Sequence, residues 1–153
     1  MDEGPEQIHQ LVMDLIRVAG LLQPDQIVPG RPVSMSQAFG LHELDTDDPL
    51  TQNELAERLR LEKSTVSRMV ADLERKGLLL RERDPANRRF YRLRLTPAGR
   101  KLHAGMAAAM HEHFVRSVSS MAPAEREALL TGLPALIKAM HLDTLSATEE
   151  NAE

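Results

Sequence analysis

Residues 50–77 read LTQNELAERLRLEKSTVSRMVADLERKG, and this run predicts two short helices joined by a tight turn. Thr51 and Glu54 form a capping box for the first helix, because each side chain can bond the backbone amide of the other residue. The second helix is expected over about 64–76. Gly77 ends it, since glycine readily takes the left-handed conformation of a helix C-terminus. The side chains expected to face the core are Leu55, Ala56, Leu59, Val66, Met69, Val70 and Leu73. This pattern is typical of a helix-turn-helix.

A β-hairpin is predicted directly after these two helices. Leu78–Glu82 and Phe90–Leu95 have strand character, and the second segment alternates apolar and basic residues. Asp84–Asn87 between them has turn chemistry. Thr96 then caps another helix, with Pro97 at the first helical position, where a missing amide hydrogen costs nothing.

Helical periodicity extends on both sides of this region. An apolar stripe predicts a helix over 5–22, and the prolines and glycine of 23–32 predict a loop. Ser34 is expected to cap a helix that runs to about Leu44. Beyond the hairpin, a long helix is expected to continue to about Ser120.

The last helix is expected to begin at Pro123. Gly132 and Pro134 lie inside its apolar pattern and predict a kink or a break, because proline cannot donate a backbone hydrogen bond. The polar tail from Leu145 is expected to fray.

The predicted fold class is mostly α with a small β-hairpin wing, a winged helix-turn-helix. Three regions are expected: an N-terminal helix and loop (1–33), the winged helix-turn-helix (34–96), and C-terminal helices with a polar tail (97–153).

The distribution of charge indicates a polyanionic partner. The chain has 153 residues and a formal net charge of −4, yet residues 58–101 hold 14 Lys and Arg against 5 Asp and Glu. Residues 1–57 hold 2 against 11, and residues 102–153 hold 3 against 7. A basic block of this kind concentrates positive potential on one part of a fold. The plainer alternative is a solvated basic face.

Several classes of protein are excluded or disfavoured by composition. The chain contains no cysteine, so disulfides, thiolate metal sites and thiol redox switches are excluded. No run of about 20 apolar residues is present, and the acidic N-terminus does not match a signal peptide, so a cytoplasmic protein is expected. No glycine-rich phosphate loop or nucleophile elbow occurs, and the carboxylates are scattered, so we expect neither an enzyme nor a cofactor.

The second helix of residues 50–77 is the candidate recognition helix. Its expected outward face carries Ser64, Thr65, Ser67, Arg68, Asp72 and Arg75. Short hydroxyls let a backbone approach a DNA groove, and Arg68 can bond guanine O6 and N7 together. Lys63, at the helix start, suits a phosphate. The alternative is that the hydroxyls merely cap and solvate the helix.

The hairpin tip is the second candidate DNA element. It is flanked by Arg81, Arg83, Arg88 and Arg89, and arginines on a thin ribbon fit the strongly negative minor groove. The alternative is a charged hairpin that resists edge-to-edge pairing.

The run from Leu50 to Gly99 resembles a winged helix-turn-helix of the MarR family of bacterial transcriptional regulators. The matching pieces are Leu50–Ala56, Ser64–Arg68, Leu73–Leu78, Asn87–Arg89 and Leu95–Gly99, and the flanking helices also fall where that family has them. The family wing usually carries Asp-x-Arg. Here Arg89 matches, whereas Asn87 stands in place of the aspartate that would orient it.

The resemblance implies a homodimeric DNA-binding regulator, in which the N- and C-terminal helices of regions 1–33 and 97–153 are dimerisation helices. We expect it to act as a repressor and to bind a pseudo-palindromic site. The predicted DNA-binding residues are Lys63, Ser64, Thr65, Ser67, Arg68, Arg75, Arg83, Asn87, Arg88 and Arg89. Family members are often released from DNA by a small molecule bound between the dimerisation helices and the winged domain. Met35, Phe39 and His42 are the candidates to line such a cavity, although a Met and Phe stripe is more often plain core.

Two alternatives remain open on the residues. One is a zinc-responsive regulator of the same fold, because some family members bind zinc through the helices that here carry His42, Glu43, His103, His111, Glu112 and His113. No His-x-x-x-His pair occurs, so ordinary histidines are the preferred interpretation and no metal site is assigned. The other is a helical adaptor that binds protein and no DNA.

Overall fold

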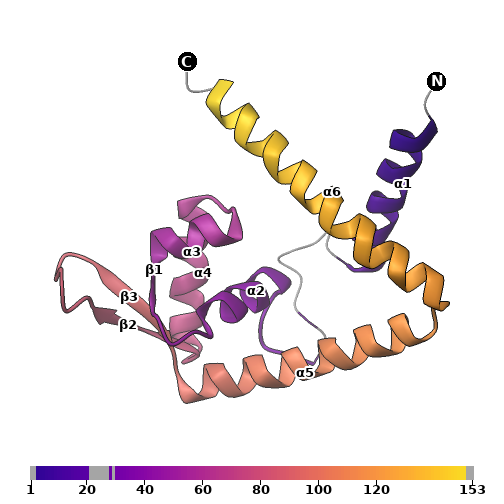
Figure 1. The fold of residues 1–153 in the computed structure, drawn as a ribbon. Coiled ribbons are helices and arrows are strands. Elements are labelled where there is room, and N and C mark those ends of the chain that lie inside the picture. The colour runs from indigo at the N-terminus through magenta and orange to yellow at the C-terminus, as the bar shows by residue number, and fades with distance from the viewer. Residues whose placement is uncertain (1–2, 21–27, 29, 151–153) are drawn as a thin grey trace. The chain divides into compact units, whose positions relative to one another are not determined.

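The computed structural model describes residues 3–20, 28 and 30–150, and Figure 1 shows the elements within them. The helices are α1 (Glu3–Val18), α2 (Met35–Leu44), α3 (Gln52–Leu59), α4 (Lys63–Arg75), α5 (Pro97–Ser119) and α6 (Pro123–Glu150), and the strands are β1 (Leu50–Thr51), β2 (Leu79–Arg83) and β3 (Tyr91–Leu95). The predicted fold class, mostly helical with a small winged sheet, is confirmed. The chain divides into two compact units, Met1–Ala107 and Ala108–Glu153, which are described separately.

Helix α2 begins where the sequence predicts but buries a different face. The Ser34 hydroxyl accepts from the amide of Gln37 at 3.2 Å, and the Gln37 side chain accepts from the amide of Ser34 at 3.0 Å. The buried residues of α2 are Gln37, Gly40, Leu41 and Leu44. The predicted apolar side at Met35 and Phe39 points elsewhere, and Phe39 is 51% exposed. Gly40 explains the choice of face, because a Cβ there would meet the Met69 sulfur at 2.8 Å, so α2 and α4 approach closely.

Helices α3 and α4 form the predicted helix-turn-helix. The capping box of α3 is present, with Thr51 N donating to Glu54 Oε2 at 2.7 Å and Glu54 N donating to Thr51 Oγ1 at 3.2 Å. Arg60 ends α3 in the left-handed conformation, with φ of 54°. Helix α4 runs from Lys63 to Arg75, with Lys76 as its C-cap, and Gly77 follows with φ of 71°. There Leu78 N donates to Leu73 O and Gly77 N to Glu74 O, each at 2.9 Å, which is a Schellman motif.

The sheet contains one strand that the sequence pattern does not reveal. Strand β1 pairs antiparallel with β3, so that the strand order is β1-β3-β2 and the sheet has three strands at Leu93 and Arg92. Leu50 lies opposite Leu93, and Leu79 lies opposite Leu95. Two residues are too few for a periodicity signal, which is why β1 escapes the sequence analysis.

The core of the first unit lies between α2, α3, α4 and the inner face of the sheet. Its fully buried side chains are Val33, Leu41, Leu55, Val66, Val70, Leu73, Leu79, Leu93 and Leu95. Each aliphatic side chain buried in this way contributes roughly 1.5–3 kcal/mol relative to an exposed one. This core fixes α4 and the sheet in one rigid frame, since both contribute to it.

Helices α1 and α5 begin and end largely as predicted. Helix α1 stops at Val18, and Gly20 follows it with φ of 71°. Most of the loop predicted at 23–32 lies outside the described residues. The Thr96 hydroxyl accepts from the amide of Gly99 at 3.0 Å and so caps α5. Gly99 packs against the Leu78 carbonyl, where a Cβ would clash.

Helix α6 differs from the prediction in two respects. It continues through Gly132 and Pro134 without a break, and it extends to Glu150 rather than fraying from Leu145. Pro134 removes one backbone donor, whereas the turns before and after it keep theirs. The neighbouring Leu130 is largely exposed, so water can satisfy the carbonyl that Pro134 leaves without a donor.

Within the residues that the structure describes, no helix is both long and apolar enough to cross a membrane.

Candidate nucleic-acid interface

On the outward face of α4, the side chains of the first two turns form no hydrogen bond or ion pair with other described residues. Val66, Val70 and Leu73 turn into the core, which leaves Ser64, Ser67 and Arg68 exposed and Thr65 half-buried. The N-cap position is Glu62, and no side chain there makes a capping hydrogen bond. The three hydroxyls therefore do not cap the helix, whereas the alternative that they only solvate its surface stays open. Across the described part of the chain, neither these hydroxyls nor Lys63 nor Arg68 has a side-chain partner.

Arg75, near the other end of α4, is engaged with its neighbours. It forms an ion pair with Asp72, which also pairs with Lys76 at 2.7 Å. Asp72 accepts a further hydrogen bond from the buried Gln37 of α2, at 2.5 Å. The bonds from Lys76 and Gln37, and then that from Arg75, lower the pKa of Asp72 to about 2. Arg75 is therefore less available than Arg68 to bind a DNA phosphate or base, although the sequence pattern places both on the same face of the helix.

The wing tip is shaped by side chains that bond its own backbone. Asp84 Oδ1 accepts from Ala86 N at 2.8 Å, and Asn87 Oδ1 accepts from Arg89 N at 3.2 Å. Arg83 donates to the carbonyl of Arg88 at 2.6 Å. Two Asx-type bonds therefore hold the turn in one conformation. Asn87 orients the backbone of Arg89 rather than its guanidinium.

The arginines of the tip are presented in different ways. The Arg83 guanidinium lies 4.9 Å from the centre of the Tyr91 ring, a cation–π contact that fixes its direction. The side chains of Arg88 and Arg89 are exposed, and neither forms an ion pair within the described residues. An open groove beside the wing is lined by Thr51, Gln52, Asn53, Arg81, Arg89, Phe90, Tyr91 and Leu93. The start of α3 and the wing thus share one surface, which the sequence analysis did not anticipate for Gln52 and Asn53.

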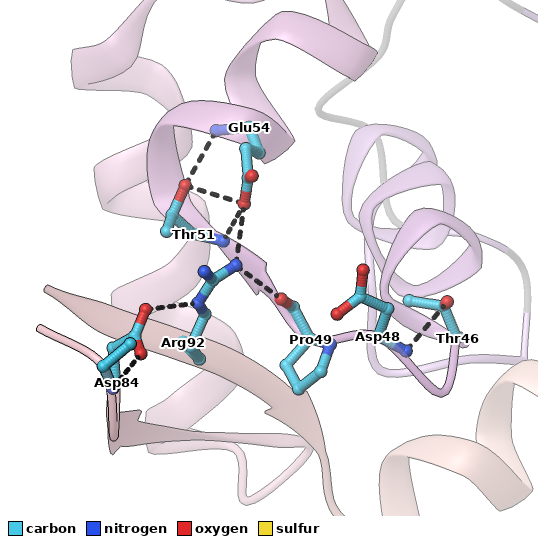
Figure 2. Close-up of polar contacts among 8 residues, drawn as sticks. Thr46, Asp48, Pro49, Thr51, Glu54, Asp84 and Arg92 are labelled. Carbon is cyan, nitrogen blue, oxygen red and sulfur yellow. Dashed lines mark hydrogen bonds and ion pairs between the residues drawn. The ribbon is translucent and has the colours of Figure 1, made fainter.

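A polar cluster at the base of the wing joins three segments (Figure 2). Arg92 Nε donates to Asp84 Oδ2 at 2.8 Å, and its second nitrogen reaches the Pro49 carbonyl at 3.1 Å and Glu54 Oε2 at 3.3 Å. The Asp84 side chain is only 10% exposed. Its pKa is lowered by the hydrogen bond from Ala86 N and then by that from Arg92. Sequence alternation places Arg92 on the outer face of the strand, but its partners depend on β1, which the sequence did not reveal.

Some basic residues of the block 58–101 form ion pairs within the protein, which leaves fewer cations available to bind a polyanion. Of the 14 basic residues in 58–101, six form ion pairs with acidic side chains: Arg58, Arg75, Lys76, Arg81, Arg92 and Arg94. Of the six predicted cationic DNA contacts, five have no ion pair among the described residues: Lys63, Arg68, Arg83, Arg88 and Arg89. These five cations lie at the start of α4 and at the wing tip, where a polyanion would be expected to bind.

The candidate ligand residues occupy one side of α2. Met35 is half-buried, and Phe39 and His42 are exposed. His42 Nδ1 lies 3.2 Å from His103 Nε2 of α5, and His103 Nδ1 lies 2.6 Å from Asp45 Oδ2. Both ring nitrogens of His103 are thus used within the protein.

The histidines do not converge as metal ligands in the described chain. His42, His103 and Asp45 form a hydrogen-bonded chain rather than a ring around a common point. His111 and His113 are exposed on α5. Among the side chains that the structure describes, no group of three or more His, Asp or Glu is suited to hold a metal ion.

Comparison with known proteins matches residues 33–90 to the model of the MarR family. The chain is 30% identical over 93 residues to the putative transcriptional regulatory protein for the hcr operon of Thauera aromatica, a match that covers 60% of this chain and 56% of that protein. The chain therefore spans little more than half the length of this relative.

Solved structures share the fold along most of the chain. The MepR–DNA complex of Staphylococcus aureus superposes with a TM-score of 0.71 at 26% identity, covering 86% of this chain and 97% of that one. PcaV of Streptomyces coelicolor, in complex with its natural ligand, has a TM-score of 0.68 at 25% identity, covering 92% and 97%. Residues 33–90 thus match the MarR family model, and the winged helix-turn-helix architecture is shared with these solved structures along most of the chain.

Proposed function

We propose that this protein is a transcriptional repressor of the MarR family that binds duplex DNA sequence-specifically as a homodimer and is released by a small molecule. The observation that carries the proposal is the set of uncompensated cations on α4 and the wing tip, next to three unengaged hydroxyls. A relative of the same fold is described as a DNA complex, which supports the same assignment. Repression needs only occupancy of a promoter.

Each predicted contact has a distinct part in this proposal. Helix α4 enters the major groove, where Arg68 reads a guanine and Ser64, Thr65 and Ser67 approach base edges or phosphates. Lys63 meets a phosphate at the helix start. The wing, with Arg83, Asn87, Arg88 and Arg89, follows the adjacent minor groove. Arg75 joins them only when DNA competes with Asp72 for its guanidinium.

A homodimer follows from apolar surface that the single chain leaves exposed. The exposed large hydrophobic residues of the three outer helices are Ile8, Leu11, Met13, Leu15 and Val18 on α1, Met110, Phe114, Val115 and Val118 on α5, and Leu129, Leu130, Leu133, Ile137 and Met140 on α6. Apolar patches this extensive mark interaction surfaces. In the proposal, regions 1–33 and 97–153 pair with a second copy and 34–96 binds DNA. A two-fold dimer presents its recognition helices about 34–36 Å apart and reads a pseudo-palindrome.

The effector site belongs to the same proposal. Met35, Phe39 and His42 share one side of α2 and include exposed apolar area that a ligand could cover. PcaV, of the same fold, is described with its natural ligand bound. In this proposal the protein is cytoplasmic. It acts by binding DNA reversibly and is not an enzyme.

The salt dependence of DNA binding tests the proposal. Counterion release predicts that affinity falls on the order of 10³-fold or more between 50 and 200 mM salt if about six phosphates are contacted. A selection from random duplexes should recover an inverted repeat, and a band shift at both salt concentrations then measures the affinity. Failure to bind any duplex would contradict the proposal and favour the helical adaptor instead.

A zinc-responsive version is the second candidate, and the juxtaposition of His42 and His103 favours it over other metal arrangements. It predicts that operator affinity changes with added zinc and reverts with a chelator, and that His42→Ala removes the response. Equal affinity under all three conditions would exclude it.

A further inference from the structure

Arg92 lies where the sheet changes from three strands to two. Strand β1 pairs with β3 only at Leu93 and Arg92, which lie opposite Leu50 and Thr51. Beyond Arg92, the hairpin continues through the pair Tyr91 and Arg83 without a third strand. A two-stranded ribbon is marginally stable and twists easily, so the direction of the wing must be fixed from its base.

The Arg92 side chain joins the two sides of this boundary. On the base side it donates to the Pro49 carbonyl and to Glu54, the residue that closes the capping box of α3. On the wing side it donates to Asp84, just after β2. Figure 2 shows the guanidinium lying between Asp84 and Glu54, which come from separate elements.

Asp84 extends the connection into the wing tip. Its second oxygen accepts from the amide of Ala86 in the turn that leads to Asn87 and Arg89. The side chain is nearly buried, so loss of Arg92 would leave its charge poorly solvated. A continuous chain of hydrogen bonds therefore runs from the start of α3 through Arg92 and Asp84 to the tip.

Arg94, two residues along the same strand, provides the natural comparison. It has the same chemistry and a similar exposure, and its ion pair with Glu82 at 3.1 Å remains between β2 and β3. It makes no link to α3 among the interactions of the described residues. Arg92 and Arg94 thus carry the same charge, but only Arg92 links the wing to α3.

We propose that Arg92 is a positioning residue that sets the direction of the wing relative to α3 and α4, and thereby where Arg89 meets the DNA. The inference rests on the proposed DNA-binding function and adds to it a residue that makes no DNA contact itself. Its guanidinium is engaged on both sides, whereas the Arg89 side chain is left available.

A double-mutant cycle between Arg92 and Arg89 tests this inference. In the otherwise wild-type protein, Arg89→Ala is expected to weaken operator binding roughly tenfold. In the Arg92→Ala background the same change should cost less than about threefold, because a misdirected wing has already lost that contact. Affinities are measured by band shift on one operator with A·T-rich flanks, at fixed salt.

Two matched cycles separate positioning from general destabilisation. Arg94→Ala removes the same charge from the same strand, and in that background Arg89→Ala should keep its full cost. Arg68→Ala should cost as much with Arg92→Ala as without it, since α4 is held by the core. Arg92→Lys keeps the charge but not the fork, so it should behave like Arg92→Ala and also serves if the alanine variant does not fold.

The outcomes distinguish this inference from the proposed function. If the wild-type chain binds no duplex, the proposed function fails. If it binds and the Arg92 and Arg89 effects simply add, the positioning role is refuted while DNA binding stands. Equal loss of the Arg89 effect in the Arg94→Ala background would also overturn it.

Discussion

Identical side chains on α4 have different surroundings, and this decides what each can do. Arg68 is exposed and has no ion pair within the described residues, whereas Arg75 is paired with Asp72. A guanidinium already held by a carboxylate must give up that contact before it binds DNA, so part of its binding free energy is lost. The same reasoning ranks Arg88 and Arg89 above Arg92 and Arg94 as DNA contacts.

Arg68→Ala is the first prediction at the residue scale. The variant should lose roughly 1–3 kcal/mol of operator binding and should discriminate less at one base position, because a bidentate contact to guanine is removed. Band shifts on the selected operator and on single-base variants measure both effects. Arg100→Ala is the control, since Arg100 is exposed on α5 without an ion pair in the described chain. Wild-type affinity and discrimination in Arg68→Ala would show that α4 is not the reading element.

Asp72 carries the second prediction, on pH. Its pKa falls from 3.8 to about 2 on folding, because Lys76, Gln37 and Arg75 favour the ionised carboxylate. A lowered acid pKa contributes stability that is fully present above about pH 4 and is lost as pH falls through about 2. Asp72→Asn should therefore lower the free energy of unfolding at pH 6 by about 1 kcal/mol and flatten its decline toward acid.

Urea unfolding at several pH values between 6 and 2.5 measures this effect. Asp47→Asn is the matched control, because Asp47 is exposed in the turn after α2 and forms no ion pair in the part of the chain described. Parallel stability curves for wild type and Asp72→Asn would contradict the assignment.

At the scale of elements, the ends of α3 and α4 are determined by short local motifs. The Thr51 capping box and the Gly77 Schellman motif both use residues within a few positions of one another. Local motifs of this kind are encoded in contiguous sequence, which is why both ends were predicted correctly. Strand β1 and the inward face of α2 depend instead on partners far away in the chain, Leu93 and Met69 among them.

Gly77→Ala and Gly132→Ala form the prediction at this scale. Gly77 has φ of 71°, so alanine there should destabilise the protein by about 1–2 kcal/mol. Gly132 lies within α6 with open space around its Cα, so alanine there should stabilise the helix by up to about 1 kcal/mol. Thermal unfolding of both variants shows whether each substitution raises or lowers the stability of the protein. A loss of stability in Gly132→Ala would show that a second chain packs closely against that position.

At the scale of the whole molecule, the buried core stabilises the single chain, whereas the exposed apolar faces are available for association. The core holds α2, α3, α4 and the sheet together without help from another chain. The apolar residues of α1, α5 and α6 remain exposed in the single chain. A soluble monomer rarely leaves so much apolar surface in contact with water, so association is expected to accompany folding.

Removal of residues 1–23 is the prediction at this scale. The truncated protein should no longer dimerise and should lose operator affinity, because one recognition helix contacts only half of a pseudo-palindrome. Sedimentation equilibrium measures the association. In the full chain, Leu11→Glu should weaken the dimer and Gln10→Glu should not, since Leu11 is among the exposed apolar residues of α1 and Gln10 is polar. A stable monomer that binds the operator as tightly as the full chain would refute the dimer.

Local sequence determined the helix-turn-helix, the wing turn and the basic block, because caps, glycine stops and periodicity act over a few neighbouring residues. Tertiary structure decided the pairing of β1 with β3, the buried face of α2, and the ion pairs that engage six of the basic residues. The physical reason is that burial and charge pairing depend on which residues meet in space. Arg92 illustrates the limit: its position on the strand follows from alternation, but its link between α3 and the wing exists only in the folded chain.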